Sequence, residues 1–405
     1  MSLELLTQLS AEEKHRMRRW VERGATVYIR GSIEPARRYS LRPLAEFEFE
    51  SAMQPSLGYR FTTHWILPSA IAGETAEIAR DRPVALGLSN SAHPLLTSTH
   101  SSGEQSPIIF AVEIGAGIIV CDLNEENDDE SVPLISRLSD PAARAAIAGT
   151  LAAVDYAAGR DASLSAPINL VIDDRPINHD FFNGGRTEKF LKHIDAQCAG
   201  IRVDFAWTPN QTRVNRAYIE TLRRYNTGYV WHGFMRHMDH RTIMDLETDL
   251  SIGRSLIREI AKKYDVEIQP VMIFPYEKDT PTCVELLRRA DFVAKVQSFD
   301  PDPRAAPRSY FRLRSAQTDT SAGATFATLF RESEAMLDRN RMLALATLGM
   351  PIIALAHPNN LGVQRFRPTR DQMGPSYFDR IARFAAEKSL RPMSLENIAR
   401  EMPVD

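Results

Sequence analysis

The chain has 405 residues, more than one hydrophobic core usually serves, so we expect two domains. Hydrophobic residues make up 43% and charged residues 25%, the composition of an ordinary globular protein. With 49 basic against 52 acidic residues the formal net charge is −3, and no Lys/Arg run is long enough to follow a phosphate backbone, which argues against nucleic acid as a partner.

The cysteines and the apolar runs argue against disulfide-rich, thiolate-metal and membrane-spanning proteins. Cys121, Cys198 and Cys283 are far apart and form no C-x-x-C motif, so they predict neither a disulfide framework nor a thiolate metal site. The longest apolar runs, 108–120 and 342–356, are each interrupted and do not predict a membrane span. The N-terminus, MSLELLTQLSAEEKHRMRRW, lacks the long apolar core of a secretory signal. We therefore expect a cytoplasmic location, or an extracytoplasmic one if a signal segment precedes this sequence.

The first part of the chain combines helices and strands. Ser10 and Glu13 have the S-x-x-E spacing of a capping box, so a helix is expected over 11–23, before the strand ATVYI. PIIFAVEIGAGIIVCDL predicts two strands joined by a glycine-containing turn, and SDPAARAAIAGTLAAVDYAAG predicts a helix. These elements predict a smaller α/β domain over residues 1–160, followed by a linker within 159–167.

From Pro167 onward, strands and helices alternate. The expected strands are Ile168–Ile172, Val203–Trp207, Tyr229–Trp231, Val271–Phe274, Phe292–Val296 and Ile352–Leu355. A helix is expected to begin at Pro281, and Ser376–Lys388 has apolar residues at helical spacing. Repeated βα units predict a parallel sheet over residues 167–405, closed as a barrel or doubly wound, with functional residues at the carboxyl ends of its strands.

Asp173 and Asp174 directly follow the first of these strands, in VIDDRPINHD. Neighbours on a regular strand point to opposite faces, so both carboxylates can reach one pocket only where the strand gives way to a loop, as Arg175 and Pro176 predict. Two carboxylates held together predict a bound cation or a raised pKa on one of them. Alternatively, either carboxylate caps a turn or pairs with Arg175.

Three histidines, His232, His237 and His240, lie within VWHGFMRHMDH after a short strand. Two imidazoles and a carboxylate can hold a metal and leave a position open for water. On a helix His232 and His237 would lie about 140° apart, so they can share a metal only from a loop, which Gly233 favours; His237 and His240 would share a helix face. The alternative is that these histidines have surface or core roles.

Two more strands end in polar groups. VMIFPYEKDTP leads to Pro275 and Tyr276, and PIIALAHPNN leads to His357. Each has a simple structural interpretation alone, Pro275 and Tyr276 as a rigid turn and His357 as a polar residue at a strand end. Together with the aspartates and histidines they place polar groups at one end of several strands, as a barrel active site requires.

In this order the residues resemble four motifs of the polysaccharide deacetylase family, the NodB-homology or carbohydrate esterase 4 group. VIDDR resembles the family's T-F-D-D-G, HGFMRH its H-x-x-x-H pair, IFPY its R-x-P-Y, and IIALAH its last strand and histidine. The resemblance covers about Pro167 to the C-terminus. It implies a distorted (β/α)7 barrel.

The resemblance also implies a hydrolase that uses one divalent metal, expected to be zinc. Its substrate would be an N-acetylated amino-sugar polymer or a similar acylated amine, from which acyl groups are removed. The implied roles are Asp173 as base and His357 as acid, Asp174, His232 and His237 as metal ligands, and Pro275, Tyr276 and Arg175 at the substrate.

Three positions depart from the family's motifs. Arg175 replaces the final Gly, Ile273 replaces the motif Arg, and the histidine pair is one residue wider, which makes His240 an alternative to His237. A catalytically inactive carbohydrate-binding or scaffolding protein therefore stays open as the alternative function. A third hypothesis is a barrel hydrolase in which the aspartates and His357 act without a metal.

The N-terminal region has a fainter resemblance. LSAEEKHRMRRWVERGATVYI is similar to the later half of glutamine-amidotransferase-like domains, which have flavodoxin-like α/β folds. Because no nucleophile-elbow cysteine is present, we expect a structural or docking domain rather than an amidotransferase.

Overall fold

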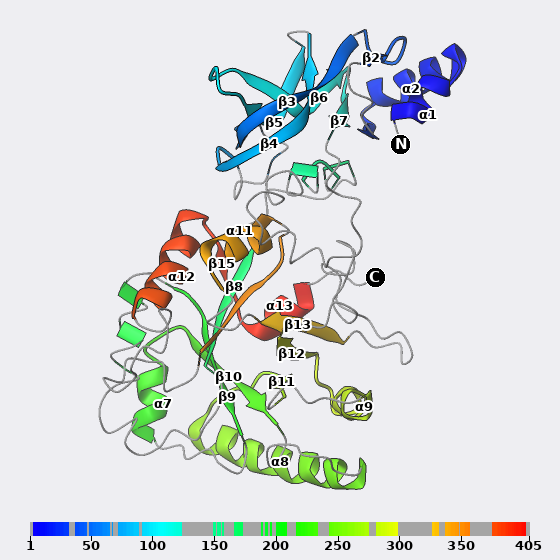
Figure 1. The fold of residues 1–405 in the computed structure, drawn as a ribbon. Coiled ribbons are helices and arrows are strands. Elements are labelled where there is room, and N and C mark those ends of the chain that lie inside the picture. Colours follow the sequence, from blue (N-terminus) through cyan, green and yellow to red (C-terminus); the bar gives the residue numbers. More distant parts are fainter. Residues whose placement is uncertain are drawn as a thin grey trace. The chain divides into compact units, whose positions relative to one another are not determined.

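The chain divides into two compact units, residues 1–165 with 343–349 and residues 166–342 with 350–405. The computed structural model describes residues 3–31, 37–46, 48–64, 67, 72–88, 91–123, 149–150, 152–154, 156–157, 166–172, 188, 191–192, 195–196, 200–208, 216–233, 243–274, 281–298, 326–331, 337–347, 349–356 and 375–401. Each unit is built on its own sheet (Figure 1). No described helix has both the length and the apolar composition needed to cross a membrane.

The first unit contains a mixed, curled sheet. Its elements are α1 (Leu3–Gln8), α2 (Ala11–Glu22), β1 (Thr26–Arg30), β2 (Arg38–Ser40), β3 (Glu48–Phe61), β4 (Thr75–Leu86), β5 (Ala92–Thr99), β6 (Gln105–Ile114) and β7 (Gly117–Asp122). The strand order is β1-β7-β6-β5-β3-β2, with β4 paired to β3. Among the described pairs of this sheet β1–β7 is parallel and the others are antiparallel. This differs from the repeated parallel βα units of a flavodoxin-like domain, because four strands that the sequence patterns did not predict, β2 to β5, make up its antiparallel part.

Local signals in this unit were predicted correctly. The Ser10 hydroxyl accepts a hydrogen bond from the Glu13 N–H at 3.3 Å, and the Glu13 carboxylate accepts one from the Ser10 N–H at 2.8 Å. This confirms the capping box at the start of α2. The predicted strand pair of PIIFAVEIGAGIIVCDL forms the antiparallel hairpin β6–β7.

Helix α2 meets this hairpin at Gly117. A Cβ atom at Gly117 would overlap the carbonyl oxygens of Val21 and Ala25. The Ile118 N–H donates to the Ala25 carbonyl at 3.3 Å, and the Ala116 N–H donates to Glu22 at 3.1 Å. The end of the helix can therefore lie directly on the backbone of the hairpin only because residue 117 has no side chain.

The second unit contains a nearly closed parallel barrel. Its strands are β8 (Pro167–Ile172), β9 (Val203–Trp207), β10 (Thr227–His232), β11 (Val271–Ile273), β12 (Ala294–Ser298), β13 (Ala327–Arg331), β14 (Ile352–Ala356) and β15 (Arg391–Pro392). They follow the order β13-β12-β11-β10-β9-β8-β14, with β15 paired to β8, and every pair in the described barrel is parallel. The expected α/β architecture, a distorted barrel preceded by a smaller domain, is confirmed.

Helices cover the outer face of the barrel (Figure 1). They are α7 (Arg216–Leu222), α8 (Ile243–Tyr264), α9 (Pro281–Arg289) and α12 (Pro375–Glu387). Two further helices differ: residues 343–347 of α11 (Arg339–Thr347) belong to the first unit, and α13 (Leu395–Glu401) packs against the inner face through Leu395, Ile398 and Ala399. Trp231 and Met272 of adjacent strands share one apolar cluster with Leu286 of α9 and Ile257 of α8. Tyr218 of α7 packs in the same way on the outer face of β9, against Phe205 and Trp207 at ring distances of 6.5 Å.

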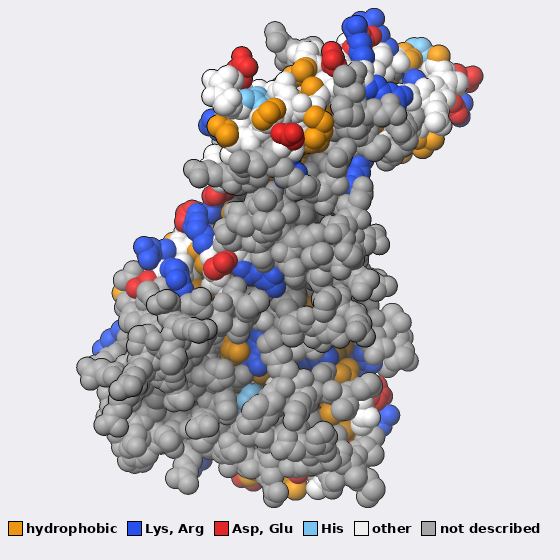
Figure 2. Space-filling view, viewed as in Figure 1, with side chains coloured by type: hydrophobic (Ala, Val, Ile, Leu, Met, Phe, Trp, Pro, Cys, Tyr) orange, Lys and Arg blue, Asp and Glu red, His pale blue; other side chains and the backbone are white. Residues whose placement is uncertain are grey.

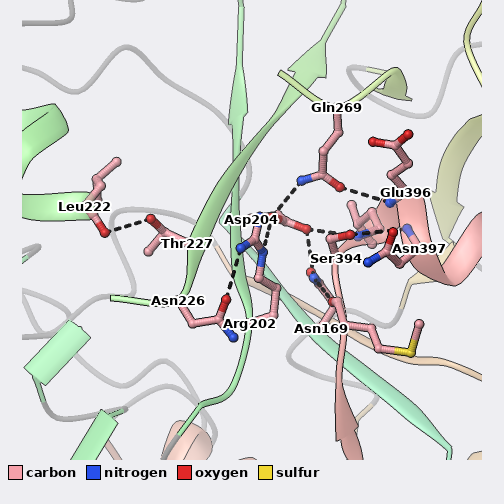
Figure 3. Close-up of polar contacts among 12 residues, drawn as sticks. Asn169, Arg202, Asp204, Leu222, Asn226, Thr227, Gln269, Ser394, Glu396 and Asn397 are labelled. Carbon is pink, nitrogen blue, oxygen red and sulfur yellow. Dashed lines mark hydrogen bonds and ion pairs between the residues drawn. The ribbon is translucent and has the colours of Figure 1, made fainter. Parts of the chain in front are cut away.

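A buried carboxylate closes the amino-terminal end of the barrel (Figure 3). Asp204 of β9 has no exposed surface. Its Oδ1 accepts hydrogen bonds from Arg202 Nε at 3.0 Å and Gln269 Nε2 at 2.8 Å. Its Oδ2 accepts from Asn169 Nδ2 at 2.8 Å and from the Leu395 backbone N–H at 3.1 Å. Four donors from β8, the segments before β9 and β11, and α13 thus converge on one side chain.

The same groups hold the chain before α13 against the barrel. Asn169 Nδ2 also donates to the Met393 carbonyl at 2.7 Å, and the Met393 N–H donates to the Ile168 carbonyl at 3.1 Å. Gln269 Oε1 accepts from the Glu396 N–H at 2.9 Å. A Cβ on Gly228, the register partner of Asp204, would overlap the Asp204 carboxylate and the guanidinium beside it. Polar groups at this end are therefore satisfied mainly by one another.

We predict that Gly117→Ala lowers the free energy of unfolding of the first unit by roughly 3 kcal/mol, because the methyl group forces two backbone segments apart. Gly103→Ala is the matched control, since nothing lies within 4 Å of its Cβ position, although its φ of +82° is left-handed. That variant should cost about 1 kcal/mol. Urea unfolding of both variants is the measurement, and equal losses would contradict the close packing at Gly117.

Asp204→Ala should lower the free energy of unfolding of the barrel by about 3–5 kcal/mol, because it leaves a largely buried guanidinium without its carboxylate partner. Glu401→Ala is the control. The Glu401–Arg391 pair has a 3.0 Å contact but its side chains are 51% and 38% exposed, so its loss should cost less than about 1 kcal/mol. Chemical denaturation would measure both, and a similar cost for the two variants would contradict the central role of Asp204.

Candidate functional site

Alternation along the strands defines which side chains line the barrel. One apolar cluster joins Val171, Ala206, Val230, Val271, Ile273, Ala294, Val296, Ala327, Leu329 and Ile353 of seven strands with Leu395, Ile398 and Ala399 of α13. Register partners such as Val271–Ala294 and Val296–Leu329 belong to it, while Met272 packs outside against the helices. Because side chains alternate with a period of two, every second residue on either side of these positions belongs to the inner face.

His232 is the one predicted site residue that the structure describes. It follows Gly228 and Val230 on the inner face and is the last residue of β10, at the carboxyl end of the barrel. Its side chain is 2% exposed, and it pairs with Ile273 of β11. The next residue, Gly233, has a φ of +74° and donates its N–H to the Ile273 carbonyl at 3.0 Å. The strand therefore ends in a turn at His232, as the loop interpretation of this motif requires.

The other predicted site residues lie outside the described residues. They are Asp173, Asp174, Arg175, His237, His240, Pro275, Tyr276 and His357. The described positions that precede them are informative, because Ile172 of β8 pairs with Ala356 of β14. Phe274, which precedes Pro275, is 1% exposed. All these strands are parallel, so the chain leaves β8, β10, β11 and β14 at the same end of the barrel.

Two described residues at this end were missed by the sequence patterns. Thr208 continues the inner-face series Asp204–Ala206, and Arg331 continues the series Ala327–Leu329; each is 3% exposed. Arg331 was missed because ATLFR, the strand β13, is a short run with only three apolar residues. The inner-face alternation is the signal that would have identified both residues once the strands were known.

At the carboxyl end of the barrel, His232 is the described side chain that suits a divalent metal as a ligand. Within the described ranges no three His, Cys, Asp or Glu side chains come together. A buried imidazole at the carboxyl end of an inner-face series is a suitable zinc ligand. Ile273, where the resembled motif has arginine, is fully buried in the apolar interior.

The opposite end of the barrel has a cavity of about 750 Å³ that is lined by Arg202, Arg223, Gln269 and Glu396, among others. Arg223 donates to the Tyr264 carbonyl at 2.7 Å, and Arg202 donates to Asn226 at 3.0 Å. Burial raises the pKa of Tyr229, which also lines the cavity, to about 12, so its phenol stays protonated near neutral pH. In parallel barrels this end serves stability and the carboxyl end serves chemistry.

Comparisons with known proteins bear on the fold. No protein-family model and no curated protein matches the chain. Among solved structures, the carbohydrate deacetylase Agd3 is similar at a TM-score of 0.56 and 9% identity, over 97% of this chain and 76% of that one.

Two further structures share less of the arrangement. A polysaccharide deacetylase described as putative, from Mycobacterium smegmatis, has a TM-score of 0.42 and 12% identity, over 59% of this chain and 90% of that one. The family 4 carbohydrate esterase from Streptomyces lividans, solved with acetate, has a TM-score of 0.35 and 13% identity, over 60% of this chain and 96% of that one. At such identities similarity speaks for the fold alone. The fold of this chain, a mixed curled sheet followed by a nearly closed parallel barrel, is similar to that of the carbohydrate deacetylase Agd3.

Proposed function

We propose that the chain is a metal-dependent hydrolase that removes N-acetyl or related acyl groups from an amino-sugar polymer or a similar acylated amine. The observation that carries this proposal is the inner-face series ending in buried His232. The inner face of β8, β11 and β14 is formed by alternate residues. The next alternate positions beyond these strands are Asp173, Pro275 and His357. These positions follow neighbouring or nearby strands at the same end of the barrel, as a common site requires.

The metal would be held by Asp174, His232 and His237, with His240 as the alternative to His237. β8 ends at Ile172, and Arg175 and Pro176 predict a loop after it, in which both carboxylates would face one pocket. A bound divalent ion, expected to be zinc, supplies a Lewis acid that lowers the pKa of water and polarises a carbonyl.

The residues of the chain would then divide the proton transfers. Asp173 takes a proton from the attacking water, and His357 as imidazolium donates one to the departing amine nitrogen. A backbone N–H near Tyr276 stabilises the oxyanion of the tetrahedral intermediate. Pro275, Tyr276 and Arg175 position the sugar. In this proposal residues 167–405 are the catalytic domain, and residues 1–160 have a docking role.

A second candidate function is a catalytically inactive carbohydrate-binding or scaffolding protein. The observation that favours it is Ile273, an apolar residue of the barrel interior at the position of the motif's arginine. Arg331, at the carboxyl end of another inner-face series, offers a guanidinium at the same end of the barrel. Turnover decides between the two functions.

The first prediction of the proposal is a stoichiometric divalent metal. Asp174→Ala and His232→Ala should lose it, because a three-ligand site that loses one ligand no longer completes its coordination. Elemental analysis of purified protein, before and after dialysis against chelator, is the measurement. Thr208→Ala, a change at the same end of the barrel outside the ligand set, is the control. Wild-type protein that takes up no divalent ion near neutral pH would favour the inactive alternative.

The second prediction separates ligands from proton-transfer groups. Asp173→Asn and His357→Ala should keep the metal and lose roughly 10²–10⁴-fold in turnover, since they remove general base and general acid without removing a ligand. Release of acetate from an N-acetylated oligosaccharide should be measured together with the metal content of each variant. Undiminished turnover in His357→Ala would remove this histidine from the mechanism, and loss of metal in Asp173→Asn would make Asp173 a ligand.

A further inference from the structure

The first unit has a large aromatic side chain on its surface. Trp20 of α2 is 63% exposed, the highest value among the large hydrophobic residues that the structure describes. Val21, the next residue, is fully buried against the sheet. Burying a tryptophan contributes strongly to stability, and tryptophan is enriched at interfaces because its indole combines a large apolar face with a polar N–H. The sheet therefore covers the face of α2 that carries Val21, and the face that carries Trp20 is exposed.

Three arginines share this face with Trp20. Arg16, Arg19, Trp20 and Arg23 follow the spacing i, i+3, i+4, i+7, which places them within an arc of about 100° on the helix. All four line one shallow depression of about 590 Å³, together with Glu13 and Met17. Figure 2 shows basic side chains on the surface in the region of α1 and α2. We name the four residues the α2 surface.

The α2 surface carries three arginines, and one carboxylate, that of Glu13, lines the same depression. Arg19 and Arg23 contact no carboxylate in the part of the chain that the structure describes. Arg16 lies 3.5 Å from Glu12, but the two side chains are 69% and 85% exposed, so this pair neutralises little. The helix macrodipole favours basic residues in the last turn of α2, but it does not account for an exposed indole among them.

We propose that the α2 surface binds a strand of an acidic, N-acetylated polysaccharide. The proposal rests on the proposed function and adds the substrate's charge to it. The indole offers a flat apolar face with a negative quadrupole, on which the C–H face of a sugar ring can pack. Guanidinium groups bind carboxylates through two parallel hydrogen bonds, so the flanking arginines would select sugars that carry a carboxylate.

A lipid surface fits this face less well. Insertion of a helix into a bilayer interface needs a broad apolar face, whereas the α2 surface offers only Trp20 and the half-buried Met17 beside it. The acidic polymer also fits the reaction. Each deacetylation converts a neutral amide to an ammonium group, so a basic surface would hold the acetylated substrate more tightly than the product.

The experiment measures binding of hyaluronan oligosaccharides, which alternate N-acetylglucosamine and glucuronate, to the full chain by titration calorimetry. Trp20→Ala and the double variant Arg19→Glu/Arg23→Glu should each weaken binding roughly tenfold or more, as loss of a central contact does. Added salt should weaken wild-type binding. Neutral chitin oligosaccharides should bind without dependence on the two arginines.

The matched control is Lys262→Glu/Lys263→Glu at the exposed end of α8, which changes the net charge by the same amount and should leave binding unchanged. The α2 variants should also keep wild-type turnover on a short neutral substrate. An inactive barrel would refute the proposed function. The binding measurement would still test the α2 surface, because binding needs no turnover. Hyaluronan affinity that ignores the α2 variants would overturn the inference. So would Trp20-dependent binding to phosphatidylserine vesicles without affinity for hyaluronan.

Discussion

The second unit depends on a charge that the barrel buries completely. Asp204 has no contact with water, yet all of its hydrogen-bonding partners come from its own chain, and they come from segments far apart in sequence. Burying a carboxylate is unfavourable unless donors replace its hydration, so the network is stable only when β8, β9, the start of β11 and α13 are all in place. One side chain thereby links the assembly of several elements.

This network also explains how the two ends of the barrel differ. At the amino end the inner face carries Asn169 and Asp204, and the Asn169 amide nitrogen donates hydrogen bonds to Asp204 and to the segment leading into α13. The middle layers carry small apolar residues, which fill a narrow barrel. At the carboxyl end the inner face becomes polar again, at Thr208, His232 and Arg331. The polar residues of the carboxyl end, unlike Asn169 and Asp204, lie next to the predicted site residues, and the proposed site is therefore at that end.

The two units offer different chemistry. The inner face of the barrel supplies side chains whose burial suits proton transfer and metal binding, because charge interactions are strong where water is excluded. The α2 surface of the first unit supplies exposed guanidinium groups and an indole, which suit reversible contact with a long anionic polymer. In the function that we propose, binding of the polymer away from the reacting atoms would raise the time that it spends near the site.

The sequence by itself determined the elements whose signals are local. The capping box of Ser10 and Glu13, the β6–β7 hairpin, and strands such as β8 and β9 follow from short-range spacing, because the residues that stabilise them are neighbours in the chain. His232 was predicted as a site residue because it is a polar residue at the end of a predicted strand, which is also a short-range signal.

Only the tertiary structure decided the remainder. In β3 a register shift between Ser56 and Gly58 interrupts the alternation, and serines, Ser51 and Ser56, are buried at positions where apolar residues would have identified the strand. β13, ATLFR, has only three apolar residues, so it was not recognised as a strand and Arg331 was identified only when pairing with β12 set its register. The exposure of Trp20 likewise depends on which face of α2 the sheet covers. These features arise from contacts between distant segments, and a pattern read along the chain contains no information on such contacts until the partner is known.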